Sequence, residues 1–185
     1  MKISKKYMKP RIVLHDVCQT VFLSSSQIKA INSMSLFDWF KKAMNLLDNQ
    51  KVKLAVVAEG LSQETKWVQF IKDNKLEVQC HGMWHIEMHK FDYKRIYEDL
   101  VLAKGIIENT FDQKITEFHP PKLKVCPAMY EVCKDLQMNL VLARWRPDHL
   151  LQGINVPEVY IHYWSQRHLN QIREVLIRQQ SPEKL

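Results

Sequence analysis

The segment Leu76-Glu-Val-Gln-Cys-His-Gly-Met-Trp-His85 joins a short run typical of a β-strand to two histidines. The strand is expected over 76–80, and it would deliver His81 and His85 to the end of a sheet. Two imidazoles four residues apart can bind one metal ion, and Gly82 permits an unusual turn from strand to helix beside the first of them. The same spacing also fits a pair on the surface of a helix, where residues i and i+4 are neighbours.

A carboxylate ends a second strand-like run, Arg11-Ile-Val-Leu-His-Asp16. Two histidines and one carboxylate are a common ligand set of catalytic zinc, with one coordination position left for water. Asp16 is therefore a candidate third ligand. His89 extends the histidine spacing by another four residues, but positions 0, 4 and 8 of a straight helix drift by about 80 degrees. We expect His81 and His85 to bind the metal and His89 to be solvated.

Strand-like and helix-like segments alternate along the whole chain. Continuous apolar runs predict strands over 11–17, 53–58, 76–80, 115–118, 139–143 and 158–162. Apolar residues at helical spacing predict helices over 35–47, 62–73, 93–109, 127–136 and 166–178. Ser33 or Ser35 is the expected N-cap of the first helix, and Pro127 is expected in the first turn of the fourth. Such alternation is typical of a parallel sheet with helical crossovers, either a barrel or an open α/β sheet.

Length and composition indicate one soluble domain. The 185 residues can bury a sizeable core, and 46% apolar with 25% charged residues is ordinary for a globular protein. We expect a single domain over 1–185, with its core at about 11–179 and tails at 1–10 and 180–185. No apolar run approaches the ~20 residues that span a bilayer. The first ten residues lack the apolar region of a signal peptide, so a cytoplasmic location without a membrane partner is expected.

Several classes of function are disfavoured by what the sequence lacks. The four cysteines form no C-x-x-C pair, which indicates reduced, mostly buried thiols. The net charge of +7 comes from dispersed residues, and no nucleic-acid motif is present, so nucleic acid is not an expected partner. Neither a P-loop nor a G-x-G-x-x-G fingerprint occurs, which disfavours nucleotide binding.

Histidines gather where the predicted strands end. Five of the eight histidines in the chain do so, namely His15, His81, His85, His119 and His162. In parallel α/β folds the loops at this edge of the sheet converge on one face, where functional sites are built. Any one of these histidines is unremarkable, but the group indicates a site.

Four segments in chain order carry a resemblance to a known family. They are His15-Asp16, His81-Gly-Met-Trp-His85, Phe118-His-Pro-Pro121 and Tyr160-Ile-His-Tyr-Trp164. They resemble successive motifs of the polysaccharide deacetylases of the NodB-homology type, and the resemblance spans about 11–164. It implies an α/β fold: a distorted, incomplete (β/α) barrel with a mostly parallel sheet.

The resemblance also implies roles for individual residues. Asp16, His81 and His85 would bind a divalent metal, with zinc the first expectation, and His162 would be the general acid. Two positions depart from the family's pattern. His15 stands where the family has the aspartate that serves as catalytic base, and His119 stands where it has an arginine.

The implied reaction is hydrolytic removal of acetyl groups from an N-acetylated, or O-acetylated, sugar or polysaccharide. His15 is the candidate base because imidazole titrates near neutrality. The predicted substrate-binding residues are His119, Pro120, Arg144, Trp84 and Trp164. The departures at His15 and His119 favour the alternative, a degenerate deacetylase fold that binds glycan or metal without turnover.

Overall fold

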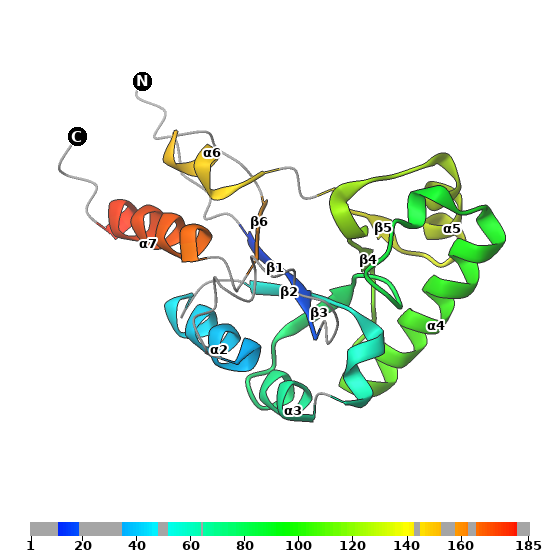
Figure 1. Cartoon of the computed structure of the whole chain (residues 1–185), viewed down its shortest axis with the longest axis horizontal. Helices are drawn as coiled ribbons and strands as arrows, with labels where there is room; N and C mark the ends of the chain where they lie inside the picture. The colour runs from blue at the N-terminus through cyan, green and yellow to red at the C-terminus, as the bar shows by residue number, and fades with distance from the viewer. Residues whose placement is uncertain are drawn as a thin grey trace, which may run out of the picture.

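One curled, open sheet organises the molecule (Figure 1). The computed structural model describes residues 11–18, 35–47, 52–63, 65–142, 145–152, 158–162 and 166–180. In these segments six strands are ordered β5-β4-β3-β2-β1-β6, and every neighbouring pair is parallel. The strands are β1 (Arg11–Val17), β2 (Val52–Val56), β3 (Glu77–Cys80), β4 (Glu117–Phe118), β5 (Asn139–Leu140) and β6 (Glu158–His162). The sheet forms a half-barrel, which confirms the predicted incomplete (β/α) barrel.

Helices connect the strands and cover the outside of the sheet (Figure 1). The α-helices are α2 (Leu36–Leu46), α3 (Thr65–Asp73), α4 (Tyr93–Phe111), α5 (Pro127–Asp135), α6 (Pro147–Leu151) and α7 (Gln166–Gln180). Short 3-10 helices are η1 (Ala58–Ser62), η2 (Met88–Lys90) and η3 (Pro121–Leu123). Ser35 caps α2, accepting a hydrogen bond of 3.1 Å from the Asp38 N–H, and α5 begins at Pro127 as predicted.

Several element bounds differ from the sequence prediction. The strands β4 and β5 are shorter than the predicted 115–118 and 139–143. The second strand ends at Val56, because the N–H groups of Ala58 and Glu59 donate to the carbonyls of Gly82 and Met83 and η1 begins there. The helix predicted from residue 62 starts at Thr65, after η1. The five-residue helix α6 was not predicted, since one turn and a half carries no clear apolar periodicity.

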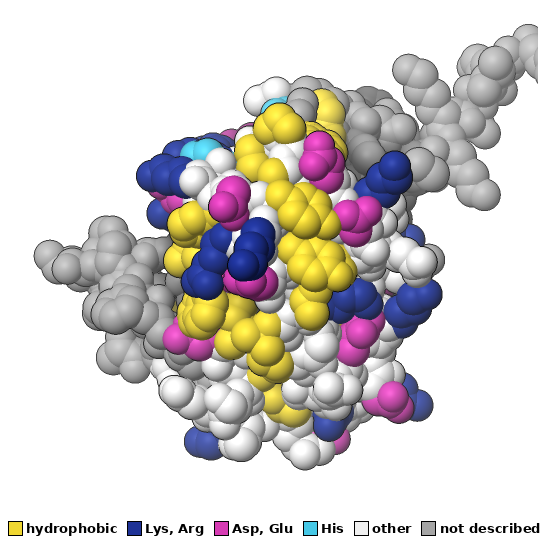
Figure 2. Space-filling model, turned by 90° about the vertical axis from the view of Figure 1, so that its right-hand side faces the viewer, with side chains coloured by type: hydrophobic (Ala, Val, Ile, Leu, Met, Phe, Trp, Pro, Cys, Tyr) yellow, Lys and Arg dark blue, Asp and Glu magenta, His cyan; other side chains and the backbone are white. Residues whose placement is uncertain are grey.

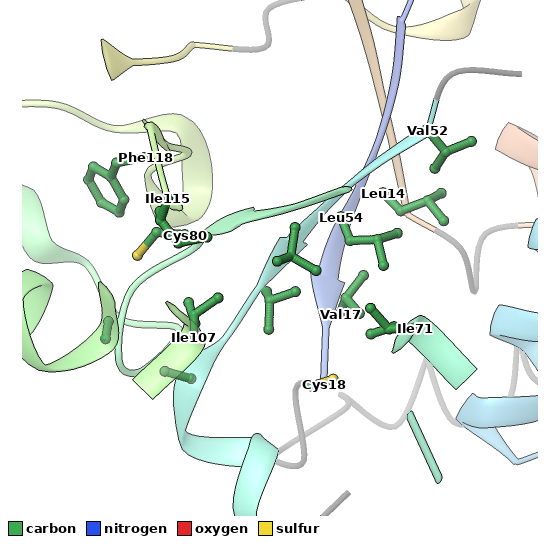
Figure 3. Packing of buried hydrophobic residues seen from close by; sticks show 14 of the residues in the cluster. Leu14, Val17, Cys18, Val52, Leu54, Ile71, Cys80, Ile107, Ile115 and Phe118 are labelled. Atoms are coloured by element: carbon green, nitrogen blue, oxygen red, sulfur yellow. The ribbon is translucent and has the colours of Figure 1, made fainter. Parts of the chain in front are cut away.

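The two faces of the sheet differ in chemistry. Leu14, Leu54 and Phe118 belong to the face covered by helices, where they pack into the main apolar core (Figure 3). The inner face carries His15 and Lys53, which are also buried. Successive strand residues point to opposite faces, so each continuous buried strand presents one apolar and one partly polar row. The inner row is where a polar site can form.

The outer surface of α4 and α5 remains partly apolar. Figure 2 shows a band of hydrophobic side chains between charged ones on this side of the molecule. The exposed large hydrophobic residues of these two helices are Tyr93, Tyr97, Val101, Leu102 and Tyr130.

All four cysteines lie in described segments and are reduced thiols, as predicted. Among the described helices, none combines the length and apolarity needed to cross a membrane.

Two leucines of α4 offer a matched test of the core. Leu100 is fully buried, whereas Leu102 is 48% exposed. Leu100→Ala should lower the free energy of unfolding by about 2–5 kcal/mol, because the lost methyl groups leave a cavity. Leu102→Ala should change it by no more than about 0.5 kcal/mol. Urea unfolding followed by circular dichroism measures both, and equal effects would contradict the packing described for α4.

Candidate metal centre and active site

Asp16 enters the site through an irregularity in β1. Leu14 pairs with Leu54 and Val17 pairs with Val56, so β1 has one residue more than β2 between these two points. The extra residue is accommodated at Asp16, whose backbone is left-handed with φ 60. Aspartate tolerates this region better than most residues. In a regular strand His15 and Asp16 would point to opposite faces. Here the rings of His15 and His81 lie 4.9 Å apart, and Asp16 also contacts His81.

His81 is held on both of its ring nitrogens. Its Nδ1 lies 2.6 Å from the carbonyl oxygen of His119, and its Nε2 lies 3.1 Å from Oδ1 of Asp16. Because a carbonyl oxygen only accepts hydrogen bonds, Nδ1 must donate and therefore carries a proton. In the neutral ring the lone pair is then on Nε2. This is the tautomer that a metal ligand of this kind requires.

His85 approaches the same carboxylate from an irregular loop. Its Nε2 also lies 3.1 Å from Oδ1 of Asp16. Residues 81–87 contain no helix, so the alternative of a helical surface pair is wrong. Gly82 has φ +90, so it does form an unusual turn, but the turn leads from β3 into this irregular loop and not into the expected helix. The Met83 N–H donates a hydrogen bond of 2.9 Å to Asp99 on α4, and this contact fixes the loop between the two histidines.

These three side chains fit a cation in donor type and charge. Within the described segments, Asp16, His81 and His85 form the group that could hold a metal ion, with their ligand atoms all within 4.8 Å of one another. A neutral His81 turns a lone pair toward a carboxylate oxygen, and such a contact is favourable only with a cation at that point. Burial lowers the pKa of His81, which disfavours the imidazolium as that cation. Burial alone would raise the pKa of Asp16, but its close contacts with the rings of His81 and His85 hold it well below its usual range.

His15 and His162 line the same space on the inner face. His15 is 3% exposed, and burial lowers its pKa well below the usual value. The Nε2 of His162 lies 3.6 Å from Oδ2 of Asp16, and burial lowers the pKa of this ring too. His168 of α7 stacks on His162 at 5.6 Å and accepts a hydrogen bond of 3.2 Å from the His162 N–H. Both candidate proton-transfer residues therefore lie beside Asp16.

The predicted substrate-binding residues are less uniformly placed. Trp84 is half-buried in the loop between the two histidines, with the Arg95 guanidinium 6.0 Å from its ring. His119 and Pro120 are buried, so this conformation offers them no direct contact with a substrate. Arg144 and Trp164 lie outside the described residues.

Sequence reasoning assigned no role to several polar residues beside the site. His89, predicted to be solvated, has its Nδ1 buried without a hydrogen-bond partner in the described structure. Arg146 donates from Nε to the Tyr160 hydroxyl at 2.8 Å, and the Tyr160 ring lies 5.5 Å from that of His15. The buried Lys53 forms an ion pair with the half-buried Glu117 on the inner face. For Lys53, Glu117 and Tyr160, only the alternation of strand residues between the two faces could have indicated a place near the site, because the strands read as continuous apolar runs.

A comparison with models of protein families gives a match over more than half of the chain. The sequence model of the polysaccharide deacetylase family matches residues 32–141, which is more than half of the chain. No curated protein matches the chain in sequence.

Solved structures share the fold at low sequence identity. A CE4 family pseudoenzyme from Bacillus anthracis superposes with a TM-score of 0.69 at 16% identity, covering 95% of this chain and 62% of its own. A mutant of that pseudoenzyme with restored enzymatic activity gives a TM-score of 0.71 at 16% identity, covering 96% and 64%. A family 4 carbohydrate esterase from Streptomyces lividans in complex with acetate gives 0.64 at 13% identity, covering 92% and 88%. The chain thus spans less than two thirds of the pseudoenzyme's length.

Two glycines provide a matched test of the loop that carries the histidines. A Cβ on Gly82 would lie 3.3 Å from the Trp84 carbonyl oxygen at a positive φ, whereas a Cβ on Gly105 in α4 meets nothing within 4 Å. Gly82→Ala should lower the free energy of unfolding by about 1–3 kcal/mol because of backbone strain. Gly105→Ala should raise it by about 0.5–1 kcal/mol through helix propensity. Chemical denaturation of both variants checks the pair, and a neutral Gly82→Ala would refute the strained turn.

Proposed function

We propose that this chain, which belongs to the polysaccharide deacetylase family, is a metal-dependent hydrolase that removes acetyl groups from an N-acetylated, or O-acetylated, carbohydrate. The observation that carries the proposal is the convergence of His81 Nε2 and His85 Nε2 on one carboxylate oxygen of Asp16. The two histidines and the carboxylate are a common ligand set of catalytic zinc. Asp16, His81 and His85 are therefore the proposed ligands, and zinc is the proposed metal.

A bound metal would supply Lewis acidity, which polarises the acetyl carbonyl and makes water a stronger nucleophile at neutral pH. The chain's own residues then have to orient the substrate and move protons. Trp84 is half-buried beside the site and offers a ring face on which a sugar can stack.

Two imidazoles are placed to transfer protons in the proposed reaction. His15 is neutral because burial lowers its pKa, so it can accept the proton that the attacking water loses. His162 would protonate the amine nitrogen as the carbon–nitrogen bond of the acetamide breaks. The Asp16 carboxylate, 3.6 Å from His162 Nε2, stabilises the charged form that this donation requires.

Removing either histidine ligand tests the metal centre. His81→Ala and His85→Ala should each lose bound zinc, measured by metal analysis after dialysis, and should release no acetate from N-acetylglucosamine oligomers or O-acetylated xylo-oligosaccharides. His89→Ala is the matched control, because His89 continues the four-residue spacing yet lies outside the ligand group. It should keep the wild-type zinc content. Acetate release by a metal-free His81→Ala variant would overturn the mechanism.

A second candidate function is binding of a glycan or a metal without turnover. It is favoured by His15, whose Nε2 is buried without a hydrogen-bond partner in the described structure and whose lowered pKa makes it a weak base. The similarity in fold to a pseudoenzyme is compatible with this candidate.

Substitution of His15 separates the two candidates. If His15 is the base, His15→Ala should lower kcat for acetate release by about 10²–10⁴-fold, with zinc content unchanged. If the wild type releases no acetate and His15→Asp does, the second candidate is correct. Equal acetate release by the wild type and His15→Ala would exclude His15 as the base.

A further inference from the structure

A lysine is buried on the inner face of the sheet, close to the proposed metal centre. Lys53 lies on β2 and is only 2% exposed. Its ammonium group pairs with the Glu117 carboxylate of β4, and Oε1 of Glu77 is 3.5 Å away. Moving a charge out of water is costly, and an ion pair withdrawn from water often contributes no more stability than apolar residues of the same volume. The pair is therefore poorly explained by stability alone.

Glu117 divides its two oxygens between Lys53 and His119. Oε1 accepts from the Lys53 ammonium, and Oε2 lies 3.2 Å from Nε2 of His119. The hydrogen bond from His119, together with Lys53, lowers the pKa of Glu117 to about 2, so the carboxylate is ionised. An ionised carboxylate only accepts hydrogen bonds, so Nε2 of His119 must carry a proton. Glu117 thereby fixes both the orientation of this ring and the site of one of its protons.

His119, held in this way by Glu117, contacts two residues of the site. Its carbonyl oxygen accepts the 2.6 Å hydrogen bond from Nδ1 of His81. Its ring packs against the His15 ring at 5.6 Å with the planes at 89°. Since His119 is 0% exposed, it is well placed to support the site from beneath rather than contact a substrate.

We propose that Glu117 is a positioning residue for the metal centre, with Lys53 as its buried counter-ion. It holds His119, and His119 in turn orients His81 as a ligand and gives His15 a fixed surface to pack against. The inference rests on the proposed function in one respect, namely that His81 binds the metal. Direct hydrogen-bond partners of metal-ligating histidines typically contribute 10–100-fold to metal affinity, and Glu117 acts through one such partner, His119.

Two double variants that differ in a single acceptor test the proposal. The leucine double variant, Lys53→Met with Glu117→Leu, removes the charges and the acceptor for His119. The glutamine double variant, Lys53→Met with Glu117→Gln, removes the charges and keeps an acceptor oxygen. The leucine double variant should bind zinc or cobalt about 10–100-fold more weakly than the wild type in calorimetric titration, and the glutamine double variant should recover most of that affinity. Glu77→Gln, which alters the other partner of Lys53, should leave the metal affinity of the protein unchanged.

A spectroscopic readout separates positioning from a merely structural role. In ¹⁵N NMR of the metal-free wild type, His119 should be protonated on Nε2 and His81 on Nδ1. The leucine double variant should show a mixture of His119 tautomers, with an unfolding midpoint close to that of the glutamine double variant. A His119 protonated on Nδ1 alone in the wild type would overturn the proposal even if the leucine double variant failed to fold. Equal metal affinity of the two double variants would also overturn it.

Different results would contradict the proposed function and the proposed role of Glu117. If His81→Ala binds zinc as tightly as the wild type, the ligand assignment is wrong, while the His119 tautomer still reports on Glu117. If His81→Ala loses zinc but the leucine double variant does not, only the role of Glu117 is refuted.

Discussion

The contact between Asp16 and the two histidines depends on one extra residue in β1. Parallel strands in regular register would send His15 and Asp16 to opposite faces of the sheet. The left-handed backbone at Asp16 turns both side chains toward the inner space, so a base candidate and a ligand candidate come from adjacent positions. The carboxylate then lies beside three imidazoles, two in the loop that follows β3 and one at the end of β6. The geometry of the site follows from this irregularity.

The inner face achieves its polarity by pairing its charged groups. Asp16 is surrounded by imidazoles and Lys53 pairs with Glu117, so these two buried charges each have a partner of complementary character. Asp99 is the less balanced case. One of its oxygens accepts from the Met83 N–H, the other is buried without a partner in the described structure, and burial raises its pKa. The unpaired oxygen of Asp99 therefore costs free energy at the same contact that holds the loop carrying His81 and His85.

Much of this architecture could be predicted from the sequence. The bounds of β1 and β6 and the meeting of Asp16, His81 and His85 follow from apolar runs and from the convergence of parallel strand ends. The supporting residues could not be found in this way. Lys53 stands at the start of a run that reads as fully apolar, and Glu117 is an ordinary charged residue until the curl of the sheet brings β4 within reach of β2. Their pairing depends on tertiary geometry that local patterns do not contain.

The position of β6 has a consequence for synthesis of the protein. This strand is made late, yet it pairs with β1, the first strand, through a register that joins Arg11 to Glu158 and His15 to His162. During translation one side of β1 has its backbone donors and acceptors unpaired until the ribosome has delivered residues 158–162. An open strand edge can template pairing with other chains. Until β6 emerges, the open edge of β1 is therefore exposed to pairing with other chains.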